Sequence, residues 1–177
     1  MKYIIAALLC LVATGCSVPH SIKEGGPVAG QQINPKATVL VLNVKDGQEQ
    51  GQAPATGSGQ GMVAALRRVL STHGVPLSVT QTTDLSAGFD QARQNGFSYV
   101  LQCVITLWQD NATAWSGNGD KLNVSVEVYD GKTHQLLAAA THKRTATGAT
   151  FVSGSPDRFM DEVAVGALSR IYGWPVK

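Results

Sequence analysis

The sequence has few of the residues that most catalytic and metal-binding motifs require. It has three cysteines and four histidines in 177 residues, and no two histidines lie four residues apart as in a zinc-binding helix. Cys10 and Cys16 stand near the N-terminus, so the body of the chain holds only Cys103. One thiol cannot form an intramolecular disulfide, and we expect Cys103 to pack as a small hydrophobic residue. The fold must therefore depend on its apolar core rather than on disulfides.

The chain also lacks an excess of charge of either sign and a long apolar run. Its 14 Lys and Arg residues nearly balance 12 Asp and Glu residues, which argues against a nucleic-acid-binding face and an acidic disordered tail. The N-terminal apolar run covers only residues 3–12. That run is too short for a transmembrane helix, which needs roughly 20 apolar residues.

The first 16 residues instead have the pattern of a signal peptide that ends at a cysteine. Lys2 supplies the positive charge, residues 3–12 supply the apolar region, and Ala-Thr-Gly-Cys follows at residues 13–16. This pattern resembles the bacterial lipoprotein signal, in which a diacylglyceryl group is attached to the cysteine sulfur. Ala13 is a less usual residue there than leucine. The resemblance implies that residues 1–15 are removed and Cys16 is lipidated; the alternative is an ordinary secretory signal with a chance cysteine.

Lipidation of Cys16 would make the lipid bilayer the first partner of this protein. Each buried methylene contributes roughly 0.8 kcal/mol, and two or more acyl chains anchor a protein stably. Ser17, rather than aspartate, follows the cysteine, and by the sorting habit of enterobacterial lipoproteins this implies the outer membrane, with the domain facing the periplasm. Residues 16–36 are rich in Gly, Pro, Gln and Ser, which predicts a flexible tether with a span of about 25 Å.

Residues 37–177 suit one globular domain by their length. Apolar periodicity and turn residues predict the order β-α-β-α-β-β-β-α, which indicates a mixed α/β domain with a four- to five-stranded sheet packed against helices. In the long strand 97–110, alternation places Trp108 on the same face as Val104. The expected elements are a buried strand in 37–44, a helix in 62–74, strands at 77–80, 97–110, 120–130 and 135–147, and helices at 85–96 and 155–173.

Chemistry-bearing patterns are weak. Gly-Ser-Gly-Gln-Gly at residues 57–61 matches neither the dinucleotide-binding nor the P-loop spacing, so we expect a flexible loop. The acidic residues show no spacing typical of a general acid–base pair. The sequence therefore predicts no catalytic residue, no metal ligand and no cofactor, and we expect a protein that is not an enzyme.

The corner at residues 108–119, which joins this long strand to the next one, is the candidate binding surface. It contains two of the three tryptophans together with small polar residues; the candidates are Trp108, Asp110, Thr113, Trp115 and Ser116. Our preferred interpretation is a structural corner whose rings cover the end of the sheet. The second is a platform for a sugar or a protein partner, because tryptophan is enriched in binding hot spots. The edge strands are further candidates, through addition of a partner strand.

The same region carries a resemblance to a known family. A Tyr-Val-Leu strand leads to a Trp and then to Ala-Thr-x-Trp-Ser-Gly; the matching residues are Tyr99, Trp108, Ala112, Thr113, Trp115, Ser116 and Gly117. This pattern resembles a family of small bacterial envelope lipoproteins whose domain has no assigned function. The likeness covers about residues 37–172, and the turn at 130–134 departs from the family pattern. A weaker fold-level likeness to envelope-assembly lipoproteins is by analogy only.

These observations together favour an outer-membrane lipoprotein that acts as a non-enzymatic binding or accessory subunit in envelope assembly or maintenance. A periplasmic lipoprotein that binds a small ligand or a glycan at the corner is the alternative. The expected partners are the bilayer, through acylated Cys16, and an envelope protein, with the oligomeric state left open.

Overall fold

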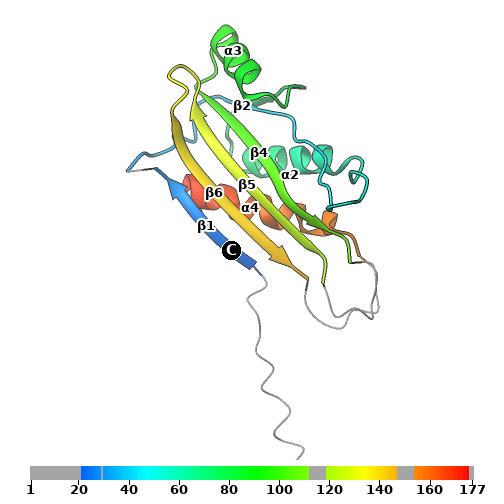
Figure 1. Cartoon of the computed structure of the whole chain (residues 1–177). Helices are drawn as coiled ribbons and strands as arrows, with labels where there is room; N and C mark the ends of the chain where they lie inside the picture. The colour runs from blue at the N-terminus through cyan, green and yellow to red at the C-terminus, as the bar shows by residue number, and fades with distance from the viewer. Residues whose placement is uncertain (1–20, 29, 112–118, 147–153, 176–177) are drawn as a thin grey trace, which may run out of the picture.

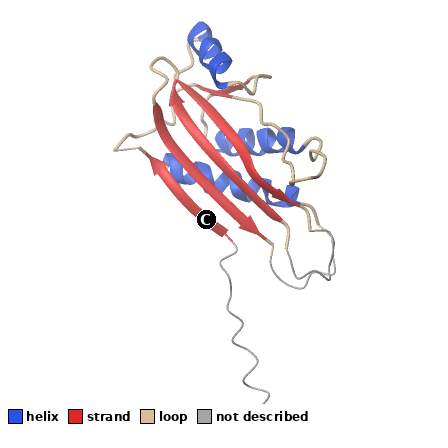
Figure 2. Cartoon of the chain, in the orientation of Figure 1, coloured by secondary structure: helices blue, strands red, loops and turns tan. Residues whose placement is uncertain are grey.

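A computed structural model describes residues 21–28, 30–111, 119–146 and 154–175. One sheet runs through this region, with helices packed on it (Figures 1 and 2). The strands are β1 (Ser21–Pro27), β2 (Val39–Val41), β3 (Leu77–Val79), β4 (Tyr99–Gln109), β5 (Lys121–Asp130) and β6 (Leu136–Thr145). The helices are α2 (Ser58–Thr72), α3 (Leu85–Asn95), the short 3-10 helix η2 (Pro156–Phe159) and α4 (Met160–Tyr172).

The sheet is mixed, as predicted. Its strand order is β1-β6-β5-β4-β2-β3. Strand β2 is parallel to both β3 and β4, whereas β4, β5, β6 and β1 form an antiparallel series. The parallel pairs arise because α2 and α3 connect β2 to β3 and β3 to β4, and the antiparallel pairs β4–β5 and β5–β6 join strands that are consecutive in the chain. The antiparallel pair β1–β6 instead joins strands far apart in the chain. This confirms the mixed α/β class and the order of the elements from β2 onward.

Helices cover the two faces of the sheet unequally. The main core joins the inward residues of the sheet to α2 and α4, with Leu66 and Ala167 both fully buried. A smaller core lies on the opposite face, where Leu40, Leu42 and Val100 pack against α3. Successive residues of a strand point to opposite faces, so β2 is buried on both faces and contributes to both cores.

The number of strands and the start of the domain differ from the prediction. Residues 16–36 were expected to form a flexible tether, but Ser21–Pro27 forms strand β1 and pairs with β6 from Ser21↔Arg144 to Pro27↔Ala138. Ile33, in the same segment, is 6% exposed and belongs to the main core. The prediction of a four- to five-stranded sheet and of a tether extending to residue 36 was therefore wrong. An edge strand is held largely by backbone hydrogen bonds on one side, so it needs no clear apolar alternation.

The glycine-rich segment 57–61 is also more ordered than predicted. Gly57 has φ 88° and precedes α2, which begins at Ser58 rather than at Met62. A Cβ atom on Gly59 would lie 2.1 Å from the carbonyl oxygen of Val44. These glycines therefore form the first turn of α2 against the chain that follows β2, and the expectation of a flexible loop was wrong.

The ends of α3 and α4 agree with the capping residues in the sequence. The Asp84 side chain accepts a hydrogen bond from the Ala87 amide at 2.7 Å, and Gly96 ends α3 with φ 72°. Ser155 precedes η2, which leads directly into α4, and Gly173 ends α4 with φ 70°. Such caps satisfy the unpaired amides and carbonyls at helix ends. Among the described helices, none has the length and apolar character needed to cross a bilayer.

Candidate functional site

Much of the candidate surface lies outside the described residues. Cys16, Thr113, Trp115 and Ser116 all fall in the segments that the structure leaves undescribed. The placement of the lipidation residue and of the second tryptophan therefore stays a prediction from sequence. Trp108 and Asp110 are the two candidate residues whose surroundings the structure describes.

Trp108 lies in the core and not on the surface. The register between β4 and β5 shifts between Ile105 and Leu107, which marks a β-bulge. An extra residue in one strand reverses the alternation beyond it. Trp108 is therefore 5% exposed and joins the main core, whereas Val104 is 47% exposed on the opposite face. The prediction that these two side chains share a face was wrong.

The Trp108 indole packs against the loop that follows β2. A Cβ atom on Gly47 would lie 2.8 Å from Cε3 of the indole, so the ring approaches the backbone where no side chain intervenes. The glycine is required by this close approach. Trp108 thus supports the structural interpretation of the corner, and it is not available as a platform for a sugar or a partner protein.

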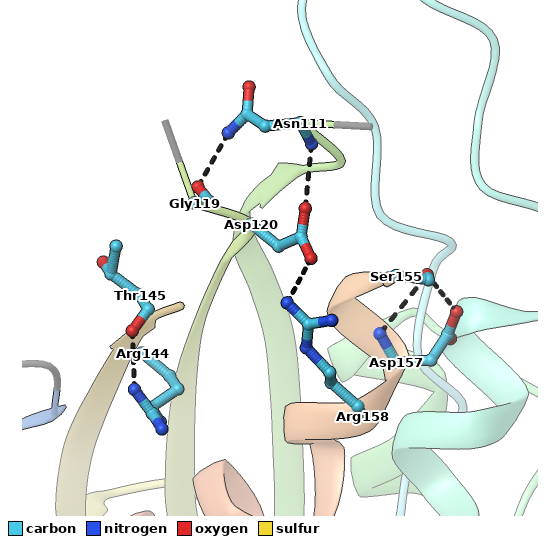
Figure 3. A network of polar contacts seen from close by, with 8 residues as sticks. All are labelled: Asn111, Gly119, Asp120, Arg144, Thr145, Ser155, Asp157 and Arg158. Atoms are coloured by element: carbon cyan, nitrogen blue, oxygen red, sulfur yellow. Dashed lines mark hydrogen bonds and ion pairs between the residues drawn. The ribbon is translucent and has the colours of Figure 1, made fainter. Parts of the chain in front are cut away.

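Polar contacts join the two ends of the corner (Figure 3). The Asn111 amide donates to Asp120 Oδ1 at 3.0 Å, and Asn111 Nδ2 donates to the Gly119 carbonyl at 2.8 Å. Arg158, from η2, forms an ion pair with Asp120 at 2.5 Å. The Asp120 side chain is 5% exposed, and the backbone carbonyl of Asp120 accepts a hydrogen bond from the Ala146 amide. A buried carboxylate with two donors is a structural feature that fixes β4, β5 and η2 relative to one another.

Asp110 is exposed beside this network. Partial burial and the nearby carboxylates of Asp120, Asp157 and Glu49 raise its pKa, while Arg158 opposes the effect. These carboxylates do not form a metal site: within the described ranges, no group of three His, Cys, Asp or Glu side chains is arranged to hold a metal ion.

The described cysteine and histidine side chains all pack against other parts of the fold. Cys103 is buried, which raises the pKa of its thiol to about 12 and keeps it protonated. His73 stacks on Trp174 with ring centroids 3.7 Å apart, and His134 stacks on Phe89 at 4.0 Å. His142 is fully buried in β6, where its Nε2 lies 2.7 Å from the Ser21 hydroxyl oxygen.

A groove between α2 and β3 is a feature that sequence reasoning did not find. Strand β3 is the last in the sheet, so one of its sides has no neighbouring strand among the described residues. The groove beside it has a volume of about 560 Å³. Its lining includes Val63, Ala64, Arg67 and Arg68 from α2, with Val79 and Gln81 from β3 and the following residues.

The groove carries positive charge. The described residues that line it include two arginines and no carboxylate. Arg68 is paired outside the lining, with Asp161 at 2.6 Å, whereas no ion pair links Arg67 to any described carboxylate. Val79 is 37% exposed. An unpaired strand edge, apolar contacts and a positive charge make this groove suitable for an extended acidic segment of a protein.

A comparison with protein-family models identifies the family of this chain, and a comparison with solved structures identifies proteins of similar fold. Residues 31–163 match the model of a domain of unknown function (DUF4823). The PelC dodecamer from Paraburkholderia phytofirmans is similar with a TM-score of 0.63 at 15% identity, over 85% of this chain and 99% of that chain.

Two further solved structures show lower similarity. Protein XCC0632 from Xanthomonas campestris, of family DUF330, has a TM-score of 0.51 at 10% identity, over 84% of this chain and 91% of that chain. Lipoprotein GNA1162 from Neisseria meningitidis has a TM-score of 0.49 at 14% identity, over 65% of this chain and 88% of that chain. A search of curated proteins finds no match. At these identities the similarities to PelC and XCC0632 establish the fold alone.

Proposed function

The chain belongs to the DUF4823 family, whose defining domain has no assigned function, and we propose that it is a lipid-anchored accessory subunit that binds a protein partner at the periplasmic side of the outer membrane. The family match confirms the likeness that the Trp and Ala-Thr-x-Trp-Ser-Gly pattern indicated. The fold shared with PelC supports the proposal, because that protein forms a multisubunit assembly.

The observation that carries the proposal is the groove beside β3. Its lining includes exposed Val79 from β3 and Arg67, which forms no ion pair with a described carboxylate. Among the described residues, β3 has no neighbouring strand on one side. An acidic segment of a partner could add alongside β3, form backbone hydrogen bonds and place a carboxylate near Arg67. Binding rather than catalysis is further supported by the reactive groups, since Cys103 and His142 are both buried.

The glycan-binding alternative has less support. It depends on an exposed aromatic platform, and Trp108 is buried against Gly47. No contact of the described corner residues favours a sugar over a structural role, because Asn111 and Asp120 are engaged with one another and with Arg158.

Membrane anchoring is tested by substitution of Cys16. We expect the Cys16→Ala protein to leave the membrane fraction after a carbonate wash, or to retain its leader, because it has no sulfur to acylate. Cys10→Ala is the matched control, since it removes a cysteine from the apolar region but preserves the lipidation residue. Mass spectrometry of the purified native protein should show an acylated Cys16. An unmodified Cys16 would refute the anchor.

The docking surface is tested by a photocrosslinking amino acid at Val79. The control position is Val165 on α4, which is 38% exposed against 37% for Val79 but does not line the groove. We expect a discrete crosslinked product from position 79 only. Arg67→Glu should abolish this product by repelling an acidic partner, while Arg93→Glu on α3 should not.

The mass of the crosslinked product identifies its components. A product that contains an acidic segment of a second envelope protein supports the proposal. Equal crosslinking from positions 79 and 165, or no effect of Arg67→Glu, would overturn it. A product that contains only two copies of this chain would instead assign the groove to self-assembly.

A further inference from the structure

Four strands have one of their ends at the same end of the sheet: β1 and β5 begin there, and β4 and β6 end there. Ser21 pairs with Arg144, Arg144 with Leu122, and Leu122 with Trp108, so these residues form one row across β1, β6, β5 and β4. Figure 1 shows these four strands side by side. We call the sheet end next to this row, formed by Ser21, Gln109, Lys121 and Thr145, the proximal end. The distal end is the hairpin from Asp130 to Leu136 that joins β5 to β6.

Few residues separate the lipidation residue from the proximal end. Strand β1 begins at Ser21, only five residues after Cys16. A chain extends at most about 3.6 Å per residue, so Ser21 lies within about 18 Å of Cys16. Strand β5 spans ten residues between the two ends of the sheet. At about 3.4 Å per residue, the distal end lies about 30 Å from the proximal end.

We propose that the proximal end of the sheet faces the lipid surface and that the distal hairpin points away from it into the periplasm. This orientation rests on the proposed lipidation of Cys16. An inverted domain, with the hairpin on the bilayer, would hold Ser21 about 30 Å above the surface. The chain from Cys16 covers at most about 18 Å, so the inverted arrangement is excluded by length alone.

The orientation requires that β1 stays in the sheet, and several contacts hold it there. The Ser21 hydroxyl lies 2.7 Å from His142 Nε2, at the first residue of the strand. Lys143 forms an ion pair with Glu24 at 3.3 Å, and Arg170 Nε donates to the Gly25 carbonyl at 3.0 Å. The contact at Ser21 matters most, because loss of pairing at this residue would lengthen the free chain first.

The experiment compares two variants of the full lipidated protein, each with one added cysteine, in vesicles of phosphatidylethanolamine and phosphatidylglycerol. Lys121→Cys places a thiol at the proximal end and Lys132→Cys places one in the distal hairpin. Each is labelled with an environment-sensitive fluorophore and exposed to lipids that carry a quencher in the headgroup region. Cys103 does not compete for the label, because it is 4% exposed and its thiol pKa is raised to about 12.

We expect at least threefold stronger quenching at position 121 than at position 132. Equal quenching, which indicates a domain lying flat, or stronger quenching at position 132 would overturn the orientation. Flotation of the vesicles is measured first and separates the two proposals: protein that does not float refutes the lipid anchor, whereas protein that floats without the difference in quenching refutes only the orientation.

A longer segment between Cys16 and Ser21 tests whether the length of this segment determines the orientation of the domain. Twenty Gly and Ser residues inserted after Ser17 would extend the maximum span from Cys16 to Ser21 to about 90 Å, which no longer excludes any orientation. We expect the difference between positions 121 and 132 to fall below 1.5-fold in this variant. An undiminished difference would show that chain length does not determine the orientation.

Discussion

The contact between α4 and His142 yields a prediction that opposes simple helix propensity. Gly166 lies within α4 and faces the buried His142 ring. A Cβ atom at this position would lie 2.0 Å from Nδ1, 2.5 Å from Cε1 and 3.0 Å from Cγ of that ring. The ring cannot easily move, because it is fully buried and its Nε2 lies 2.7 Å from the Ser21 hydroxyl. The Gly166→Ala variant must therefore displace either α4 or the imidazole.

The size of the effect follows from three contributions. Alanine in place of glycine within a helix stabilises the folded state by about 1 kcal/mol. Overpacking of a tight core costs about 1–3 kcal/mol, and loss of the contact between His142 and Ser21 costs about 1 kcal/mol more. We expect Gly166→Ala to lower the free energy of unfolding by about 2 kcal/mol. For a domain of this size, such a loss corresponds to a decrease of about 4–8 °C in Tm.

Gly61→Ala is the matched control, because it is also a glycine-to-alanine change within a helix. The added Cβ atom would meet only the flexible end of Met160, at 2.7 Å from Sδ. We expect this variant to be as stable as the parent or more stable. Urea unfolding followed by tryptophan fluorescence measures both variants, and thermal unfolding by circular dichroism checks them.

The double variant Gly166→Ala with His142→Ala tests the cause of the destabilisation. Removal of the imidazole creates space for the new methyl group, so the double variant should lose less stability than the sum of the two single losses. The reasoning is refuted if Gly166→Ala is as stable as Gly61→Ala, or if the losses of the two single variants simply add.

Four further measurements test other features of the structure. Burial and nearby Lys23 lower the pKa of His142 despite the opposing effect of Glu162. As the pH falls, the unfolded chain therefore takes up this proton before the folded chain does, and the free energy of unfolding should fall below a pH of about 6.5. Urea titrations at pH 7.5 and pH 5 should show less of this fall in a His142→Gln variant. Trp108→Ala should cost about 3–5 kcal/mol in urea unfolding, because the indole fills the core; a loss below 1 kcal/mol would contradict its burial. Cys103 should resist maleimide in the native state and react after unfolding in guanidinium, because its pKa is raised to about 12; rapid native labelling would contradict this. Arg158→Ala should cost about 1–3 kcal/mol in thermal unfolding, because it leaves a buried carboxylate without its cation, whereas removal of an exposed arginine such as Arg68 should cost less than about 1 kcal/mol.

The parts of the fold that follow from local patterns were predictable. In β5, apolar and polar residues alternate over the whole strand, and the structure buries Leu122, Val124, Val126 and Val128 as expected. The C-terminal ends of α3 and α4 at Gly96 and Gly173 were predictable, because glycine readily adopts the left-handed conformation that ends a helix. Even the mixed sheet followed, since helical connections produce parallel strands and hairpins produce antiparallel ones.

The candidate site was less predictable because its geometry depends on distant partners. One extra residue in β4 moves Trp108 from the surface into the core, and no local feature of the strand marks that bulge. The groove beside β3 joins Arg67 to Val79 across two elements, so only their packing creates it.

The sequence by itself determined the mixed α/β class, the order of the elements from β2 onward and the membership of the family, because alternation, helical periodicity and capping act over a few residues. Only the tertiary structure decided that Ser21–Pro27 is a strand, that Trp108 is buried and that the chain between Cys16 and the sheet is short. The physical reason is that an edge strand and a bulge owe their positions to hydrogen bonds and packing with residues far away in the sequence, here from Ser21 to Arg144.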